Sequence, residues 1–281
     1  MQQFIRYEFK YQITPTVAEA IRARLLRFGM QPDPESTKYP GNIYPVTSLY
    51  FDTPNLDDYH DKAGGLLRRK KIRVRIYAPY LAERQSATFF SRLNPTYSII
   101  ASSRYGGTRK MGLGSDADEK NVASLPSFSA IPEIWLEKKE KYEMLVTKKR
   151  VLLTLENYEN LLYGSRIDFV KNHPLFLPLL THGMRPTAMV RYLREPFVSP
   201  HQSHLRITFD SEIETCQTHD LRFPQPMTPV AKGGVIMEVK FSLALPHWFR
   251  FLLSDFSLRR QSFSKYGEAM EMLYRFHPIP R

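Results

Sequence analysis

One short pattern recurs at three separate places in the chain: a glutamate, any residue, then a lysine. It occurs as Glu8-Phe9-Lys10, Glu137-Lys138-Lys139 and Glu238-Val239-Lys240. In a β-strand, positions i and i+2 share a face, so each acid would point the same way as its lysine. Carboxylate oxygens are ligands for hard divalent cations, whereas ammonium and guanidinium groups bind anions. The pattern therefore predicts strand faces that combine metal-binding and anion-binding groups.

Two of the three intervening residues, Phe9 and Val239, are apolar, and such strands have two interpretations. In the first, the charged face is solvated and carries cross-strand ion pairs worth a few tenths of a kcal/mol each. In the second, the charged faces turn inward to line a barrel, and helices cover the apolar outer faces. We favour the second interpretation because most of the strands show the pattern. The amphipathic helix expected at 15–28 also needs an apolar sheet face to cover.

The elements that must position these charges are mainly strands. Alternation predicts strands near 4–13, 46–52, 69–77, 133–142, 145–153, 188–193, 205–210 and 235–241. Helices are expected at 15–28, from the Thr154 cap, after Pro246 and from Ser264, and a short helical or turn element at 54–62. The expected fold class is α+β, an eight-stranded antiparallel β-barrel with a charged lumen and helices packed outside. We expect a single domain over 1–281, with an insertion at about 79–132 that shows only weak periodicity.

Composition narrows the class of partner. The formal net charge is +12, from 40 Lys and Arg against 28 Asp and Glu, which suggests nucleic acid, an anionic membrane surface or a phosphate compound. A basic surface kept for solubility is the alternative. The cations sit in alternating strands beside glutamates, and not in a basic helix or an aromatic stacking platform, which argues against nucleic acid.

The compartment is expected to be the cytoplasm. The single cysteine, Cys216, excludes an internal disulfide, and no apolar run approaches the ~20 residues needed to span a membrane. The first residues lack the apolar stretch of a signal peptide.

A lumen rich in cations requires counter-charge, because buried like charges are costly. The interleaved glutamates supply part of it, and a phosphate chain would supply the rest, since its oxygens suit guanidinium forks and ammonium groups. Glutamates on the same faces would hold Mg²⁺ or Mn²⁺, which bridge carboxylate and phosphate oxygens. No GxxxxGK[ST] loop occurs, so a P-loop would not bind the nucleotide.

The ordered set of motifs resembles the VTC-type polyphosphate polymerase family of the triphosphate tunnel metalloenzyme superfamily. The motifs are Arg6-Tyr7-Glu8-Phe9-Lys10-Tyr11, Ser48-Leu49-Tyr50-Phe51-Asp52-Thr53-Pro54, Lys71-Ile72-Arg73-Val74-Arg75-Ile76-Tyr77, Trp135-Leu136-Glu137-Lys138-Lys139, Thr147-Lys148-Lys149-Arg150, Val190-Arg191-Tyr192-Leu193-Arg194, Leu205-Arg206-Ile207-Thr208-Phe209-Asp210, Met237-Glu238-Val239-Lys240-Phe241 and Ser262-Phe263-Ser264-Lys265-Tyr266. The resemblance implies an eight-stranded tunnel that binds a nucleoside triphosphate and a divalent metal. It further implies transfer of the γ-phosphate of ATP to a growing polyphosphate chain.

The resemblance also implies roles for individual residues. The catalytic cations would be Lys10, Arg73, Arg75, Lys139, Lys148 and Lys265. The substrate-binding set would be Arg191, Arg194, Arg206 and Lys240. Glu238 would be the metal ligand, with Glu8 and Glu137 as helpers. Tyr50 and Asp52 are expected to shape a turn.

Three alternatives stay open at the level of sequence. Hydrolysis of triphosphate or nucleoside triphosphate would use the same electrostatics with water as the acceptor. A non-catalytic module that binds polyphosphate would need only the cations. A membrane-protein partner would be required for export of the product, and no motif in the chain points to one.

Overall fold

The computed structural model describes residues 7–78, 132–143, 145–201, 204–223, 226–231, 233–242 and 244–276. The expected insertion at 79–132 lies outside this part of the chain apart from Pro132, as do the first residues of the strand expected at 4–13.

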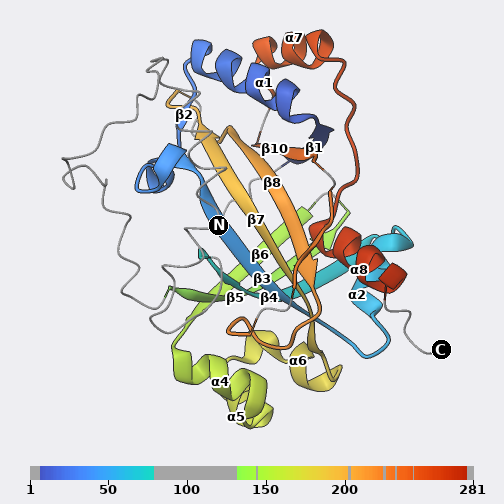
Figure 1. Ribbon diagram of the computed structural model, residues 1–281. Helices are drawn as coiled ribbons and strands as arrows, with labels where there is room; N and C mark the ends of the chain where they lie inside the picture. Colours follow the sequence, from blue (N-terminus) through green and yellow to red (C-terminus); the bar gives the residue numbers. More distant parts are fainter. Residues whose placement is uncertain are drawn as a thin grey trace, which may run out of the picture.

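One antiparallel sheet organises the described residues (Figure 1). Its strands follow the order β1-β10-β8-β7-β3-β4-β5-β6, with two short strands, β2 and β9, paired to β7 and β8. The bounds are β1 Tyr7–Ile13, β2 Gln31–Pro32, β3 Tyr44–Asp52, β4 Arg68–Ile76, β5 Ile134–Tyr142, β6 Leu145–Leu153, β7 Arg185–Val198, β8 Arg206–Cys216, β9 Thr228–Pro229 and β10 Val235–Phe241. All eight strands expected from alternation are present, and β7 and β8 are longer than expected.

The sheet curls strongly toward its charged face. Glu8 on β1 and Lys139 on β5 form an ion pair of 3.1 Å. These strands are six steps apart in the sheet order, which would separate them by roughly 29 Å in a flat sheet at about 4.8 Å per strand. Side chains at such distant strands can meet only on a concave face, so the charged face is the inner one. This contact favours the inverted arrangement that the sequence suggested.

Helices cover the apolar outer face in two groups. α1 (Pro15–Arg27) and α7 (His247–Asp255) pack on β1, β10 and β8, where Ile21 and Leu252 join a core with Met237. α4 (Leu155–Tyr163), α5 (Arg166–Asn172) and α6 (Pro178–Thr181) cover the other half beside β4, β5 and β6. Figure 1 shows the two groups at opposite ends of the molecule.

Local sequence explains where the longer outer helices begin. Thr14 accepts a hydrogen bond from the Val17 N–H at the start of α1, and Thr154 accepts one from the Asn157 N–H at the start of α4. Pro15 follows its cap at the first helical position, where no amide hydrogen is required. The short helices α5 and α6 were not expected from sequence.

Two helices lie on the inner side of the sheet. α8 (Lys265–Phe276) packs with α2 (Asp57–Ala63) against one part of the concave face. Its Tyr266 and Met270 join a third core with Tyr50 and Val190. The short helices η1 (Pro34–Ser36), η2 (Pro40–Asn42) and η3 (Pro174–Phe176) complete the fold.

The expected closed barrel requires correction. β1 and β6 form the two ends of the strand order, and no pairing joins them within the described residues. The antiparallel α+β class is confirmed, but the described architecture is a curled sheet whose edges stay separate. α8 is also not outside the sheet as expected, because its apolar side meets tyrosines of the inner face. Among the described helices, none has the length and apolar character required to cross a membrane.

Candidate functional site

The concave face gathers charged side chains from seven strands and from the start of α8. Its cations are Lys10, Lys71, Arg73, Arg75, Lys139, Lys148, Arg194, Lys240 and Lys265. Its carboxylates are Glu8, Glu137, Asp210 and Glu238. The cations outnumber the carboxylates, so this face carries an excess of positive charge that favours an anionic ligand.

The first of two groups, the arginine cluster, consists of Arg73, Arg75, Lys148, Glu137 and Tyr50. The Glu137 Oε2 atom lies 2.7 Å from Arg73 Nη2 and 3.9 Å from Arg75 Nη1, and Lys148 also contacts this carboxylate. Arg73 donates a hydrogen bond of 3.0 Å to the Tyr50 hydroxyl. One buried acid thus positions two guanidinium forks and an ammonium.

Partners outside the cluster fix the second guanidinium. Arg75 donates to the Ser48 hydroxyl over 3.0 Å and to the Tyr192 hydroxyl over 3.2 Å, and its side chain is only 6% exposed. A guanidinium held from two sides is already oriented before a ligand binds, which lowers the entropy lost on binding.

Charge perturbs the titration of this cluster. Burial alone would raise the pKa of the Tyr50 hydroxyl, but Arg73, Arg75 and Lys71 outweigh it and lower the pKa to about 8. Burial lowers the pKa of the Lys148 ammonium to about 8, against the opposing attraction of Glu137. The pKa of Glu137 lies below its usual range, because the neighbouring cations outweigh burial. These shifts are those of a site with too little negative charge.

The second group, the lysine–glutamate cluster, consists of Glu8, Lys10, Glu238 and Lys240. Lys10 Nζ lies 3.1 Å from Glu8 Oε1 and 3.8 Å from Glu238 Oε2, and Lys240 contacts the other oxygen of Glu238. The two carboxylates therefore share one lysine. The antiparallel pairing of β1 with β10 produces this arrangement, since Lys10 lies opposite Glu238 and Glu8 opposite Lys240.

Both glutamates of this cluster are ionised at neutral pH. Burial and Glu238 would raise the pKa of the Glu8 carboxyl, but Lys10, Lys139 and Lys240 outweigh them and lower it to about 2. Burial would also raise the pKa of Glu238, yet Lys240 and Lys10 hold it well below its usual range. Two ionised carboxylates on neighbouring strands form a donor set suited to a hard cation.

Asp210 connects the helix α8 to the sheet. It accepts two hydrogen bonds from Arg194, of 2.7 and 2.8 Å, and it contacts the Lys265 ammonium at the start of α8. Lys265 Nζ also lies 4.6 Å from the centre of the Tyr192 ring. The Lys265 position expected from sequence is thus part of the site, held by an aspartate that sequence analysis did not assign.

Two expected site residues lie apart from these clusters. Arg191 lies on the outer face, because its neighbour Tyr192 belongs to the inner one, and it pairs with Glu214 at 2.8 Å. The expectation that Arg191 binds substrate is therefore not supported by its placement, whereas Arg194 lies inside. Arg206 is on the inner face opposite Lys240, but it pairs with Asp33 at 3.0 Å.

The expected metal ligands do not converge. Within the described residues, no group of three or more His, Cys, Asp or Glu side chains could hold a metal ion. Glu8 and Glu238 fit a cation that takes its remaining ligands from water or phosphate, as Mg²⁺ commonly does. Glu137 does not fit this role, because three cations already surround its carboxylate.

Several inner-face residues were missed by sequence analysis. Tyr50 lies in a strand as expected, but it was expected only to shape a turn, whereas its hydroxyl accepts a hydrogen bond from Arg73. Tyr192 and Lys71 were also not assigned. The sequence carried a signal for all three. Lys71 and Tyr192 each lie two residues before an assigned arginine on the same strand and so share its face, and Tyr50 lies directly opposite Arg73 on the neighbouring strand.

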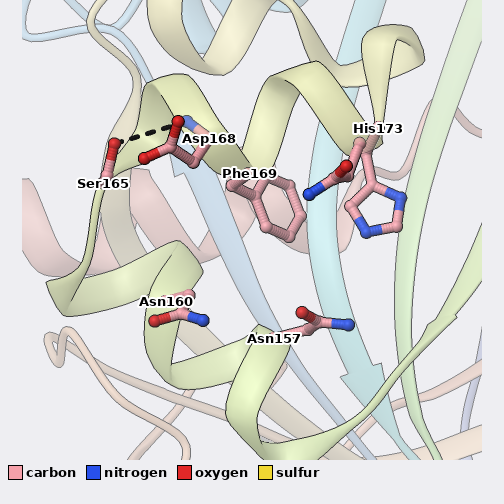
Figure 2. Close-up of a pocket in the computed structure, with 7 residues that line it drawn as sticks. Asn157, Asn160, Ser165, Asp168, Phe169 and His173 are labelled. Atoms are coloured by element: carbon pink, nitrogen blue, oxygen red, sulfur yellow. Dashed lines mark hydrogen bonds between the residues drawn. The ribbon is translucent and has the colours of Figure 1, made fainter.

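A surface hollow of about 180 Å³ lies elsewhere, between α4 and α5. Figure 2 shows Asn157, Asp168 and His173 around it, with the Asp168 N–H donating to Ser165. These helices pack on the outer face of the sheet, so the hollow is remote from the charged face. The Asp168 carboxylate pairs with Lys171 at 3.1 Å, and the residue that caps α5 is Ser165. This hollow lacks the chemistry found on the inner face.

A family model described as the VTC domain matches residues 5–93 and 124–274. A search of curated proteins gave no match.

Among solved structures, the PH1819 protein of Pyrococcus horikoshii is 11% identical with a TM-score of 0.43, over 95% of this chain and 99% of that one. A Hippeastrum protein, described as having a dominant triphosphatase activity, is 11% identical with a TM-score of 0.44, over 97% and 96%. The Mimivirus capping enzyme triphosphatase is 12% identical with a TM-score of 0.33, over 92% and 89%.

Proposed function

This chain belongs to the VTC domain family, and from that premise we propose that it is a polyphosphate polymerase that transfers the γ-phosphate of ATP to a growing polyphosphate chain. The observation that carries the proposal is the inner face itself. Buried, preoriented guanidinium and ammonium groups converge there, and a separate pair of ionised carboxylates lies beside them. Such a preorganised electrostatic site suits phosphoryl transfer, in which the protein mainly positions and neutralises charge.

The reaction requires in-line transfer between two phosphate oxygens. A terminal oxygen of the chain forms a bond to the γ-phosphorus of ATP, and the bond from that phosphorus to the β-γ bridging oxygen breaks. The electron pair of the broken bond leaves with ADP, and the chain grows by one unit. Arg73 and Arg75 are placed to bind the non-bridging oxygens that carry charge in the transition state.

The lysine–glutamate cluster provides the second half of the site. Glu238 and Glu8 would hold Mg²⁺ or Mn²⁺, which would neutralise charge on the ATP phosphates when bound. Lys10 and Lys240 orient these carboxylates in the protein alone. Lys265 and Arg194, fixed by Asp210, would bind phosphate oxygens at the start of α8. Helix N–H groups at this position would add to that binding.

The test is to incubate purified protein with ATP and either Mn²⁺ or Mg²⁺, resolve the products by size and assay free phosphate. The proposal expects ADP together with long phosphate chains that are resistant to nucleases and degraded by exopolyphosphatase. Free phosphate without chains would instead assign hydrolysis with water as the acceptor. Tight polyphosphate binding without ATP consumption would leave a binding module.

A further inference from the structure

A row of like charges crosses three neighbouring strands of the inner face. Lys71 on β4 lies directly opposite Lys139 on β5, which lies directly opposite Lys148 on β6. In the next row, Arg69 lies directly opposite Lys141. Directly opposed side chains in a sheet have Cβ atoms only about 5 Å apart, and like charges there destabilise the pairing. These five residues, the cationic ladder, are an arrangement that stability alone does not favour.

Little negative charge compensates the ladder. Glu8 lies 3.1 Å from Lys139, but the same carboxylate also serves Lys10 at 3.1 Å. The Lys71 ammonium donates to the neutral Ser264 hydroxyl over 2.6 Å. The adjacent row of Arg73, Glu137 and Arg150 contains an acid, which Lys148 also contacts, but Glu137 is shared with Arg73 and Arg75. The ladder therefore has fewer carboxylates than cations beside it.

The ladder leads from the buried site toward solvent. Side-chain exposure is 6% for Arg75 and 19% for Arg73. It rises to 38% for Lys139 and 41% for Lys148, and the strand ends at the exposed Tyr142. A ligand bound at the arginine cluster would thus meet further cations on its way out.

More cations extend this region beyond the sheet. Burial lowers the pKa of the Lys141 ammonium, and the positive charges of Arg69, Lys139 and Arg260 act in the same direction. Lys62 on α2 donates to the Ser262 hydroxyl over 2.8 Å, in the loop that carries Arg260. The concentration of positive charge is therefore shared between the sheet and the loop before α8.

We propose that the cationic ladder binds the polyphosphate chain beyond the reacting phosphates and thereby sets the length of the product. This inference rests on the proposed function for its product, but its chemistry is that of a linear polyanion. Ammonium and guanidinium groups placed side by side on neighbouring strands suit the successive oxygens of a phosphate chain. The ladder positions carry no aromatic ring on which a nucleotide base could stack.

The decisive variant is R69Q/K141Q, which removes two opposed cations outside the arginine and lysine–glutamate clusters. Its matched control is K38Q/K171Q, which removes two exposed lysines at 62% and 71% side-chain exposure, away from the inner face. Removing an opposed like-charge pair relieves repulsion, so R69Q/K141Q is expected to melt no lower than the wild type. The charge-preserving variant R69K/K141R is expected to behave as the wild type.

Two measurements separate the ladder from the chemistry. Binding of long-chain polyphosphate to R69Q/K141Q should weaken about tenfold, with a smaller dependence on salt, while binding of tripolyphosphate stays within about twofold. In turnover, the initial rate of ATP consumption should change little, while the products become shorter. The control double variant should change neither quantity.

Each outcome decides the proposal. Equal loss of tripolyphosphate and long-chain binding would overturn it, because the residues would then belong to the reacting site. Long-chain binding and product length equal to the control would also overturn it, leaving these cations a role in solubility only. If the wild type makes no chains, the proposed function fails, and the binding comparison alone still decides whether the ladder holds a polyanion.

Discussion

The two halves of the inner face are built from the same charges in different proportions. In the arginine cluster a single carboxylate, Glu137, is surrounded by Arg73, Arg75 and Lys148. In the lysine–glutamate cluster two carboxylates share Lys10. A further acid, Asp210, lies on β8, the strand beside β10. The first half is short of negative charge, and the second approaches neutrality.

The difference in charge between the two clusters indicates where each ligand is expected. A region deficient in negative charge attracts phosphate oxygens, and its guanidinium forks bind them in a defined geometry. A region with ionised carboxylates on adjacent strands attracts a hard cation. We therefore expect phosphate on the side of β4 to β6 and metal on the side of β1 and β10. Changes made on one side should therefore differ in kind from changes made on the other.

The largest effect is expected from E238Q, which should reduce ATP turnover by about 10³-fold while leaving polyphosphate binding equal or tighter. The variant removes negative charge from the half assigned to metal, so an anion loses nothing directly. Steady-state turnover over a metal titration, together with polyphosphate binding, would measure both. The control E214Q, on the outer face, should leave both unchanged. A parallel loss of polyphosphate binding would contradict the division of the face.

The next largest effect is on the stability of the protein and tests the arginine cluster. E137Q leaves Arg73 and Arg75 without their buried counter-charge, so the free energy of unfolding should fall by about 3 kcal/mol. Added tripolyphosphate should stabilise this variant more than the wild type, because it replaces the lost charge. Urea denaturation with and without the anion measures this. The control E140Q lies on the same strand with its side chain 40% exposed, and it should change stability by less than about 0.5 kcal/mol.

A smaller effect should separate the two faces of β7. R194Q removes the two hydrogen bonds to Asp210 and should reduce turnover about 30-fold. Asp210 would then no longer be held in place, and it is the carboxylate that positions Lys265. R191Q, on the outer face, should leave turnover within about twofold. Initial rates and melting temperatures of both variants would test this. Equal losses of turnover at equal stability would mean that Arg191 also reaches substrate.

The smallest effect is a pH dependence specific to the cationic half. Burial lowers the pKa of Lys71 to about 8, as it does for Lys148, so both lose charge as the pH rises through 8. Affinity for tripolyphosphate should therefore fall several-fold between pH 7 and 9. K71R, which stays charged, should flatten this profile. An unchanged profile in both K71R and K148R would exclude these lysines as the titrating groups.

Without the ligand, the stability of the protein should change with pH in the opposite direction to its affinity for tripolyphosphate. The ordinary pKa of lysine is 10.5, so between about 8 and 10.5 the unfolded chain binds more protons than the folded one. The free energy of unfolding should then rise with pH in this window as the repulsion among the lysines is relieved. Denaturation at several pH values, with and without tripolyphosphate, would reveal the reversal.

Sequence was sufficient for much of this fold because alternation and capping are local signals. The three glutamate–lysine pairs lie on β1, β5 and β10 as expected, and α1 begins at its Thr14 cap. What sequence could not decide was which side of an element faces the site. Arg191 and Arg194 are three residues apart, so they occupy opposite faces of a strand, and nothing local states which is inner. The amphipathic pattern of α8 likewise did not reveal that it packs on the concave side.

Long-range geometry explains the remaining differences. Asp210 was not assigned because its partners, Arg194 and Lys265, come from other elements. The family resemblance implied that Glu137 helps bind metal, but its position between β4 and β6 surrounds it with cations. Identical local patterns therefore acquired different chemistry from the neighbouring strands.

The open ends of the strand order have a consequence for association between molecules. An unpaired strand edge is a template on which another chain can add a strand and begin aggregation. At β1, the loop before α8 occupies part of this edge, since the Gln261 N–H donates to the Lys10 carbonyl over 2.8 Å. At β6, Lys148, Lys149 and Arg150 are exposed, and their positive charges would repel the same strand of another molecule. The cations for which we propose an anionic ligand would thus also keep neighbouring molecules apart.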